Sequence, residues 1–327
     1  MVARITRILI LLQIVAAIVL FALAVTAWQV EKLWMALAIG IGSVYLFRVL
    51  ISAHNFWTAW RYRSETPLAH RISWPQAFRL FADEFRATMW SSSWSMPFLR
   101  FSKRIATKPV GLPVLLIHGY GCNSGYWHPL SQLLKRESIT HYAIDMEPVL
   151  GDIDGYALIV QRAVEAVCRE TGHDQIILVA HSMGGLAARV YLRDHGSALI
   201  AKIITLGTPH HGTGLANLGI GLNSRQMRRE GSPRENAPSA WLRQLEQSEN
   251  SATRALFVSI FSHHDNIIAP QTSSYLPGAR NIEFHGIGHV ALALNPQVQA
   301  LVLEEIRNTD TAQRAAARVA GRKSTDL

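Results

Sequence analysis

Two long apolar runs dominate the first 51 positions of the chain. Residues 8–28 contain one strongly polar side chain, Gln13, and residues 33–51 contain one charge, Arg48, close to the end of the run. At 1.5 Å per helical residue, both runs match a hydrocarbon core of about 30 Å. A cleavable signal peptide is the alternative, but its apolar region is usually only about 7–15 residues long. The pattern therefore predicts a hairpin of two transmembrane helices within residues 1–55, with Arg48 reaching the membrane surface.

The next segment, residues 56–110, is rich in Trp, Phe and Arg. Residues 74–90 have a helical pattern in which Phe78, Phe81, Phe85 and Met89 share one face. Such a stripe is typical of a face packed on a core, and also of a helix lying on lipid headgroups. We expect the helix to end at 91–98 and an interfacial segment or linker to reach residue 110.

After residue 111 short apolar runs alternate with longer amphipathic ones, which predicts strands and helices in turn. Such alternation is typical of an α/β domain with a mostly parallel sheet and helices on both faces, here over residues 111–308. Residues 213–250 exceed a simple connection and are expected to form a cap or a surface excursion. Residues 309–327 are expected to be a disordered tail. The expected strands are residues 114–117, 141–144, 176–179, 200–206, 255–260 and 281–284, and the expected helices are 156–169, 185–195 and 297–306.

The net charge of +9 is concentrated in the first third of the chain. Positions 1–107 hold 12 basic and 4 acidic residues, and the remainder holds 20 and 19. This excess indicates contact with anionic lipid headgroups and argues against a nucleic-acid partner for the α/β domain. Basic residues flank both apolar runs, whereas the turn between them holds only Lys32 beside Glu31. The positive-inside rule therefore predicts an inner-membrane protein whose two ends and α/β domain face the cytoplasm.

The strongest chemical signal is the sequence IILVAHSMGG at residues 176–185, which predicts a strand, a tight turn and a helix with Ser182 at the apex. This is the pattern of a nucleophile elbow, G-x-S-x-G, with Ala180 in place of the first glycine. The serine backbone in such a turn is strained, so neighbouring side chains have to be small. A capping serine at an ordinary turn is the alternative.

A nucleophilic serine needs a base, and the base needs an orienting carboxylate. Asp265 follows one predicted strand and His289 follows the next, so both lie where parallel strands end and ligands gather. We expect Ser182, His289 and Asp265 to form a catalytic triad, and we prefer His289 to His285 as the base. Four other acidic residues do not fit, since three precede the serine and one lies inside a strand: Asp145, Asp152, Asp154 and Glu283.

The developing oxyanion also needs hydrogen-bond donors. The strand at residues 114–117 runs into the loop HGYG, so we expect the backbone amides of Tyr120 and Met183 to form an oxyanion hole. No nucleotide-binding pattern accompanies this loop. Two adjacent-histidine pairs lack metal-binding spacing, so neither a metal nor a cofactor is expected; they are His210–His211 and His263–His264.

Four motifs together resemble those of the small bacterial lipases and esterases of the α/β-hydrolase superfamily. They are HGYG at 118–121, AHSMGG at 180–185, LGTPHHGT at 206–213, and Asp265 with GIGH at 286–289. The resemblance covers residues 112–306 and implies an α/β-hydrolase fold, a Ser182–His289–Asp265 triad and a lipid or small ester substrate. We therefore expect a membrane-anchored serine hydrolase that acts through an acyl-enzyme. The alternatives are an acyltransferase with the same triad and a non-catalytic lipid- or protein-binding module. The sequence carries no signal for oligomeric state.

Overall fold

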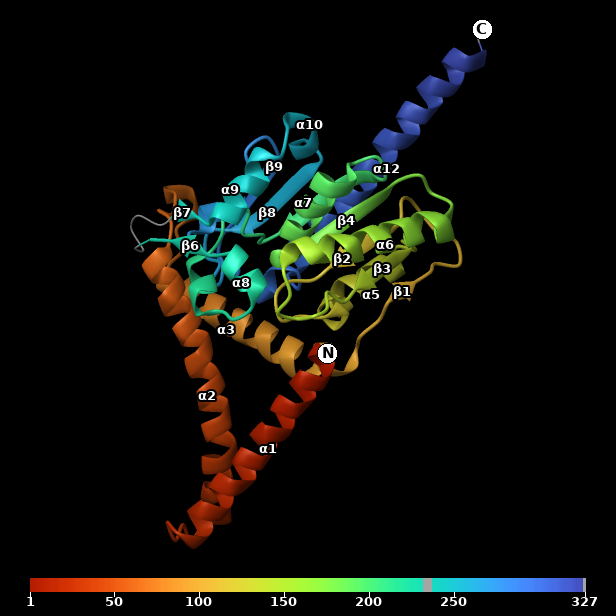
Figure 1. The fold of residues 1–327 in the computed structure, drawn as a ribbon. Helices are drawn as coiled ribbons and strands as arrows, with labels where there is room; N and C mark the ends of the chain where they lie inside the picture. Colours follow the sequence, from red (N-terminus) through yellow and green to blue (C-terminus); the bar gives the residue numbers. More distant parts are fainter. Residues whose placement is uncertain (232–236, 326–327) are drawn as a thin grey trace.

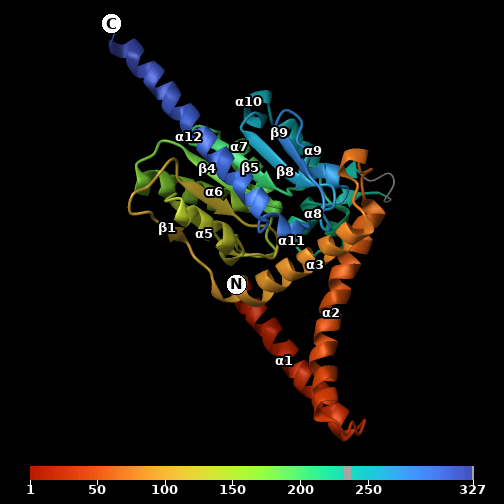
Figure 2. The ribbon, with the colours of Figure 1, turned by 180° about the vertical axis from the view of Figure 1, so that it is seen from behind.

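The computed structural model describes residues 1–231 and 237–325, in which two long helices project from an α/β domain (Figure 1). Helix α1 (Val2–Thr26) and helix α2 (Leu33–Tyr62) meet near their connecting turn and diverge toward the domain (Figures 1 and 2). Only 6% and 17% of the residues in their most apolar stretches are buried, so neither is a core helix. The two predicted N-terminal helices, long and apolar enough to cross a membrane, are confirmed.

Arg48, which the sequence predicts to reach the membrane surface, has hydrogen-bond partners within the protein, and its position relative to a membrane stays a prediction. Helix α2 continues to Tyr62, so Arg48 lies in the middle of the helix. Its guanidinium donates to Gln13 Oε1 at 2.7 Å and to Ser93 Oγ at 2.8 Å. Because partners from α1 and from the segment after α3 receive these hydrogen bonds, the charge is satisfied within the protein.

Helix α3 (Trp74–Trp90) begins with a capping box between Ser73 and Gln76. Its apolar stripe is divided: Phe85 is buried, whereas Phe78 is 76% exposed. Helix α3 is followed by a π-helical turn (Ser91–Ser95) and α4 (Met96–Phe98), so the helical stretch ends within the predicted range 91–98. The serines remain helical because they bond back to the helix, as when Ser92 Oγ donates to Thr88 O at 2.7 Å.

The α/β domain is built on a seven-stranded sheet with the order β1-β3-β2-β4-β5-β8-β9. All pairings are parallel except that of β1 with β3. The expected parallel sheet is therefore confirmed, with most boundaries close to prediction. The strands are β1 (Lys103–Arg104), β2 (Val114–Ile117), β3 (His141–Ile144), β4 (Ile176–His181), β5 (Ile200–Leu206), β8 (Phe257–Ser262) and β9 (Arg280–Phe284).

Helices cover both faces of this sheet (Figures 1 and 2). On one face of the sheet, the core is formed with α6 (Ile153–Thr171), α7 (Met183–His195) and α9 (Ala240–Gln247). On the opposite face, the core is formed with α5 (His128–Arg136), α11 (His289–Leu292) and α12 (Pro296–Thr325). Three connections between these elements contain 3₁₀ turns: η1 (Leu68–His70), η3 (Ser124–Trp127) and η5 (Gln271–Ser274).

The segment predicted as a cap or excursion, residues 213–250, has secondary structure of its own, with positions 232–236 outside the described residues. Besides α9 it contains η4 (Gly214–Leu218), α8 (Leu222–Gln226), β6 (Arg229–Glu230) and β7 (Ala237–Pro238), and α10 (Ser251–Arg254) follows it. Helix α12 continues through Thr325, into the segment 309–327 that is expected to be a disordered tail, and this expectation stays a prediction; positions 326–327 are outside the described residues. Alanine and arginine, which are frequent in this tail, favour helix.

Candidate active site

Ser182 lies at the sharp turn between β4 and α7. Its backbone has φ 55° and ψ −129°, a strained conformation for a residue with a side chain. A Cβ at Gly184 would stand 2.5 Å from the carbonyl oxygen of Ile117, and one at Gly185 would stand 2.2 Å from Thr208 Oγ1. The turn therefore needs the two small residues that the sequence supplies after Ser182 and Met183.

Asp265 and His289 are hydrogen-bonded to each other beside this turn. Asp265 follows β8, His289 begins α11, and Asp265 Oδ2 lies 2.8 Å from His289 Nδ1. Asp265 Oδ1 accepts from the amides of Ile267 and Ile268 at 2.8 and 2.7 Å. These bonds fix the carboxylate, which orients the imidazole with its proton on Nδ1 and leaves Nε2 free to act as a base.

The electrostatic surroundings favour the protonated form of His289. Burial by itself lowers the pKa of this imidazole, but the charge of Asp265, its hydrogen bond and the charge of Glu84 outweigh burial and raise the pKa. Such an imidazole accepts a proton readily from a reacting hydroxyl. His181, whose Nε2 lies 3.1 Å from the carbonyl oxygen of His289, has its pKa lowered by burial and by the charge of His289.

The tip of β5 brings the serine and the Asp–His pair together. The amide of Ser182 donates to Leu206 O at 2.9 Å, and the next residue, Gly207, borders the pair. A Cβ at Gly207 would lie 3.1 Å from Asp265 Oδ2 and 3.2 Å from His289 Nδ1. Among the described residues, no hydrogen bond joins the Ser182 hydroxyl to His289. Such contacts often tighten only when substrate binds.

The loop after β2 lies directly against the serine, since a Cβ at Gly119 would stand 2.8 Å from Ser182 Cβ. His118 fixes this loop: its Nδ1 donates to Gly119 O at 2.8 Å, and its Nε2 accepts from the amide of Met146 at 3.0 Å. Within the described part of the chain, the amides of Tyr120 and Met183 donate no hydrogen bond to the protein. Both are therefore available to an incoming oxyanion.

The other candidates from the sequence have different partners. His285 is exposed, and its Nδ1 lies 3.4 Å from His70 Nδ1. Glu283 contacts His263 at 2.7 Å. The three acidic residues that precede the serine serve elsewhere: Asp145 pairs with Arg100, Asp152 caps α6, and Asp154 pairs with Arg193.

One residue at the site, Glu84 on α3, had no signal in the sequence. Its side chain is buried, and its two carboxylate oxygens accept from the amides of Val290 at 3.0 Å and Ala291 at 2.9 Å. Burial raises the pKa of Glu84, although these two backbone hydrogen bonds oppose the shift. The carboxylate thus holds the first turn of α11, which begins with His289, and joins α3 to this loop.

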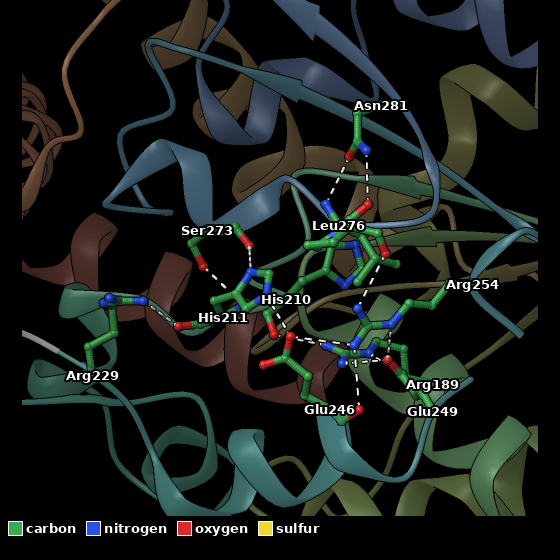
Figure 3. A network of polar contacts seen from close by, with 11 residues as sticks. Arg189, His210, His211, Arg229, Glu246, Glu249, Arg254, Ser273, Leu276 and Asn281 are labelled. Atoms are coloured by element: carbon green, nitrogen blue, oxygen red, sulfur yellow. Dashed lines mark hydrogen bonds and ion pairs between the residues drawn. The ribbon is translucent and has the colours of Figure 1, made fainter. Parts of the chain in front are cut away.

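A second unpredicted feature is a polar network behind the elbow helix (Figure 3). Arg189 on α7 is fully buried and binds Glu249 through two hydrogen bonds of 2.6 and 3.0 Å. It also donates to the carbonyl oxygen of His210 at 2.8 Å, and Arg254 contacts Glu249 from the other side at 3.2 Å. The network fastens the elbow helix to the LGTPHHGT loop and to the end of the inserted segment.

Comparison with known proteins agrees with this architecture. Residues 113–238 match the alpha/beta hydrolase fold family. Triacylglycerol lipases of Pseudarthrobacter phenanthrenivorans and Burkholderia plantarii are each 28% identical over 113 residues, or 32% of this chain. The match covers 35% and 31% of those two proteins, about a third of the length of these curated relatives.

Solved structures are similar over a larger part of the chain. The mature lipase BlEst2 of Bacillus licheniformis aligns with a TM-score of 0.55 at 16% identity, over 63% of this chain and 97% of its own. Lipase B of Aspergillus fumigatus aligns with a TM-score of 0.51 at 16% identity, over 62% and 55% of the two chains. At such identities the structural likeness establishes the α/β-hydrolase fold.

Proposed function

We propose that this chain, an α/β-hydrolase domain of the lipase and esterase type behind two apolar helices, is a membrane-anchored serine hydrolase that cleaves carboxylic esters of lipids. The observation that carries the proposal is the strained Ser182 beside a buried Asp265–His289 pair with a 2.8 Å hydrogen bond. A turn with only a structural role would not require a strained backbone together with an oriented imidazole. The triacylglycerol lipase relatives support an ester substrate.

In the proposed reaction, Ser182 Oγ attacks the ester carbonyl carbon while His289 Nε2 takes the hydroxyl proton. The negative charge on the carbonyl oxygen is held by the amides of Tyr120 and Met183. The C–O bond to the alcohol then breaks, and His289 returns the proton to that alcohol. Water, activated by the same imidazole, hydrolyses the acyl-enzyme and releases the acid. Asp265 keeps its charge and stabilises the imidazolium throughout.

The proposal places α1 and α2 across the membrane, with the domain of residues 111–308 on the side that both helix ends face. At the start of α1, Arg7 donates to the carbonyl oxygen of Pro97 at 2.7 and 2.9 Å. At the end of α2, the Tyr62 ring lies against Gly214 of the inserted segment. The first contact is with the segment that leads into the domain and the second is with the domain itself, so both ends share one side of the bilayer. The basic residues near these ends favour the cytoplasmic side of the inner membrane.

Exposed apolar side chains around the end of α2 support a substrate taken from the bilayer. Arg61 and Arg63 lie over the Trp57 and Trp60 rings, 5.2 and 4.6 Å from the ring centroids. Tryptophan with arginine is typical of the membrane interface. The inserted segment, which packs on α2 through η4, adds more apolar surface beside it. The exposed apolar residues of this region are Leu68, Trp74, Phe78, Leu218, Ile220 and Leu222.

The inserted segment also reaches the proposed oxyanion loop. Tyr120 Oη donates to Ile220 O at 2.8 Å, and the Ile220 amide nitrogen lies 3.4 Å from Tyr120 Oη. Residues 213–231 thus contact both the membrane-proximal end of α2 and the loop beside Ser182. We therefore assign this part of the insertion as a cap through which lipid reaches the serine.

The decisive experiment is labelling with a fluorophosphonate probe, combined with turnover of a short-chain nitrophenyl ester by the detergent-solubilised full chain. Wild type should react at Ser182, and Ser182→Ala should lose both labelling and turnover while keeping its melting temperature. Ser197→Ala, at an exposed serine, is the matched control and should behave as wild type. Retained turnover in Ser182→Ala, or absence of labelling in wild type, would contradict the proposal. Labelling with acyl transfer to an added alcohol in preference to water would instead identify an acyltransferase.

The lipid substrate needs a separate test. Ile220→Ser with Leu222→Ser should lower hydrolysis of an ester embedded in vesicles and leave hydrolysis of the soluble ester unchanged. Leu158→Ser, at an exposed apolar position on α6, is the control. Equal loss on both substrates would argue against a bilayer substrate.

A further inference from the structure

A cluster of imidazoles lies at the surface outside the proposed triad. His263 Nε2 lies 2.7 Å from Glu283 Oε2, and His70 Nε2 lies 3.5 Å from the same oxygen. The three donor atoms all lie within 4.8 Å of one another. A fourth side chain, His285, places its Nδ1 3.4 Å from His70 Nδ1. Three separate segments of the chain thus converge: the turn η1 after the second apolar helix, the end of β8, and β9 with the residue beyond it.

We propose that His70, His263 and Glu283 form a zinc-binding site that ties the membrane-proximal segment to the loop carrying Asp265. Two imidazoles and one carboxylate are a donor set that Zn²⁺ commonly takes from proteins. With Zn–N and Zn–O bonds of about 2.0–2.2 Å, neighbouring ligand atoms of a tetrahedral site stand about 3.3–3.5 Å apart. The separations of 2.7 and 3.5 Å bracket this value.

Burial and charge suit the entry of an ion. The His263 side chain is 3% exposed, whereas those of His70 and Glu283 are 23% and 37% exposed. One ligand is therefore held rigidly and two can adjust at an open surface. Among the described residues His263 Nδ1 has no hydrogen-bond partner, so the polar contacts of that ring lie on the Nε2 side, toward the cluster. A divalent cation would offset the carboxylate charge of Glu283.

A simple hydrogen bond between a histidine and a glutamate accounts for only part of this arrangement. Such a hydrogen bond needs one imidazole, whereas two imidazoles, those of His70 and His263, approach the Glu283 carboxylate. Their rings lie face to face with centroids 4.6 Å apart. Neighbouring His264 is not counted as a ligand, because its Nδ1 accepts from the Gly286 amide at 3.2 Å.

The position of the cluster gives the ion a structural role. His263 is two residues before Asp265, and His70 is on η1, just after the helix that we place in the membrane. Zinc would fix the distance between these segments, in addition to the hydrogen bonds by which Ser64 binds the buried Gln271 side chain. The metal site does not depend on the proposed ester hydrolysis, so the two proposals can fail separately.

The test is zinc binding to tag-free, detergent-solubilised full chain, measured by competition with a chromophoric chelator. We expect one Zn²⁺ per chain in wild type and at least tenfold weaker binding in His70→Ala and in Glu283→Gln. His195→Ala, at an exposed histidine on α7, should bind as wild type does. Zinc should raise the melting temperature of wild type and of His195→Ala but not that of His70→Ala.

Both altered side chains are partly exposed, so these variants should fold, and melting in the presence of a strong chelator checks this. Cobalt supplies an independent signal, because tetrahedral Co²⁺ gives intense visible absorption that should appear in wild type and be lost in His70→Ala. Wild-type binding no tighter than that of His70→Ala would overturn the proposal, as would equal zinc stabilisation of both.

Discussion

Replacing Glu84 should disturb His289, the proposed base, from a position outside the α/β-hydrolase domain. In Glu84→Ala, the buried amides of Val290 and Ala291 lose their acceptors. Each unsatisfied buried donor costs about 1–3 kcal/mol, so the loss of stability is about 2–6 kcal/mol. Glu84→Gln keeps one acceptor oxygen and loses the other, so its expected cost is about 1–3 kcal/mol. For a domain of this size, that lowers the melting temperature by about 2–12 °C.

Activity should change along with stability. Because α11 begins at His289, a loosened first turn displaces the imidazole, and kcat for a soluble ester should fall by about 10- to 100-fold. KM should change little, since the Glu84 side chain is buried and contacts the backbone of α11. The charge of Glu84 is one of the causes that raise the pKa of His289, so Glu84→Gln should lower that pKa. The neutral imidazole is the active base, so the acidic limb of kcat/KM should move to lower pH.

The matched control is Asp83→Asn, one residue earlier on the same helix and exposed to solvent. It should alter stability by no more than about 0.5 kcal/mol and leave the pH profile unchanged. Melting curves and pH–rate profiles of the three proteins in one detergent provide the measurement. If Glu84→Gln and Asp83→Asn give the same melting temperature and the same acidic limb, the link between α3 and His289 is refuted.

Three further substitutions test the site and its support. Asp265→Asn should lower kcat by about 10³- to 10⁴-fold with little change in KM, because the imidazole loses its orienting carboxylate; steady-state kinetics on the nitrophenyl ester measure this. Gly185→Ala should cost about 1–3 kcal/mol and reduce activity, because the new methyl group would stand 2.2 Å from Thr208 Oγ1; denaturant unfolding and the same kinetics measure both effects. Arg189→Met should cost about 3–5 kcal/mol, because it leaves the Glu249 carboxylate buried without its main partner; the shift of the urea midpoint measures it.

Matched controls separate local from general effects in this series. Gly42→Ala, at a helical glycine with open space around it, should be tolerated. Arg193→Met removes an exposed arginine from the same helix as Arg189, and its cost should stay below about 1 kcal/mol. Equal costs at the two arginines, unimpaired Gly185→Ala, or Asp265→Asn with more than a tenth of wild-type kcat would each contradict the structural argument.

Features that depend on short stretches of chain were predictable from the sequence alone. Membrane-length apolar helices follow from the length of uninterrupted apolar runs, and parallel strands follow from short apolar runs between amphipathic ones. The strained turn at Ser182 is equally local, because backbone sterics demand small residues at fixed positions around it. Asp265 and His289 could be chosen because the chain order of a serine, an acid and a base restricts the candidates at strand ends. Their catalytic roles remain predictions.

Other features were decided by contacts between distant segments. Glu84 meets the loop of His289 across more than 200 positions, and His70 approaches His263 across nearly as many. The hydrogen-bond partners of Arg48 lie on α1 and beyond α3, so the sequence around Arg48 does not indicate them. Periodicity specifies which face of an element is apolar, but which polar side chains meet depends on how complete elements pack. The turn at Ser182 is therefore determined by the local sequence, whereas its attachment to the N-terminal helices arises only from the tertiary fold.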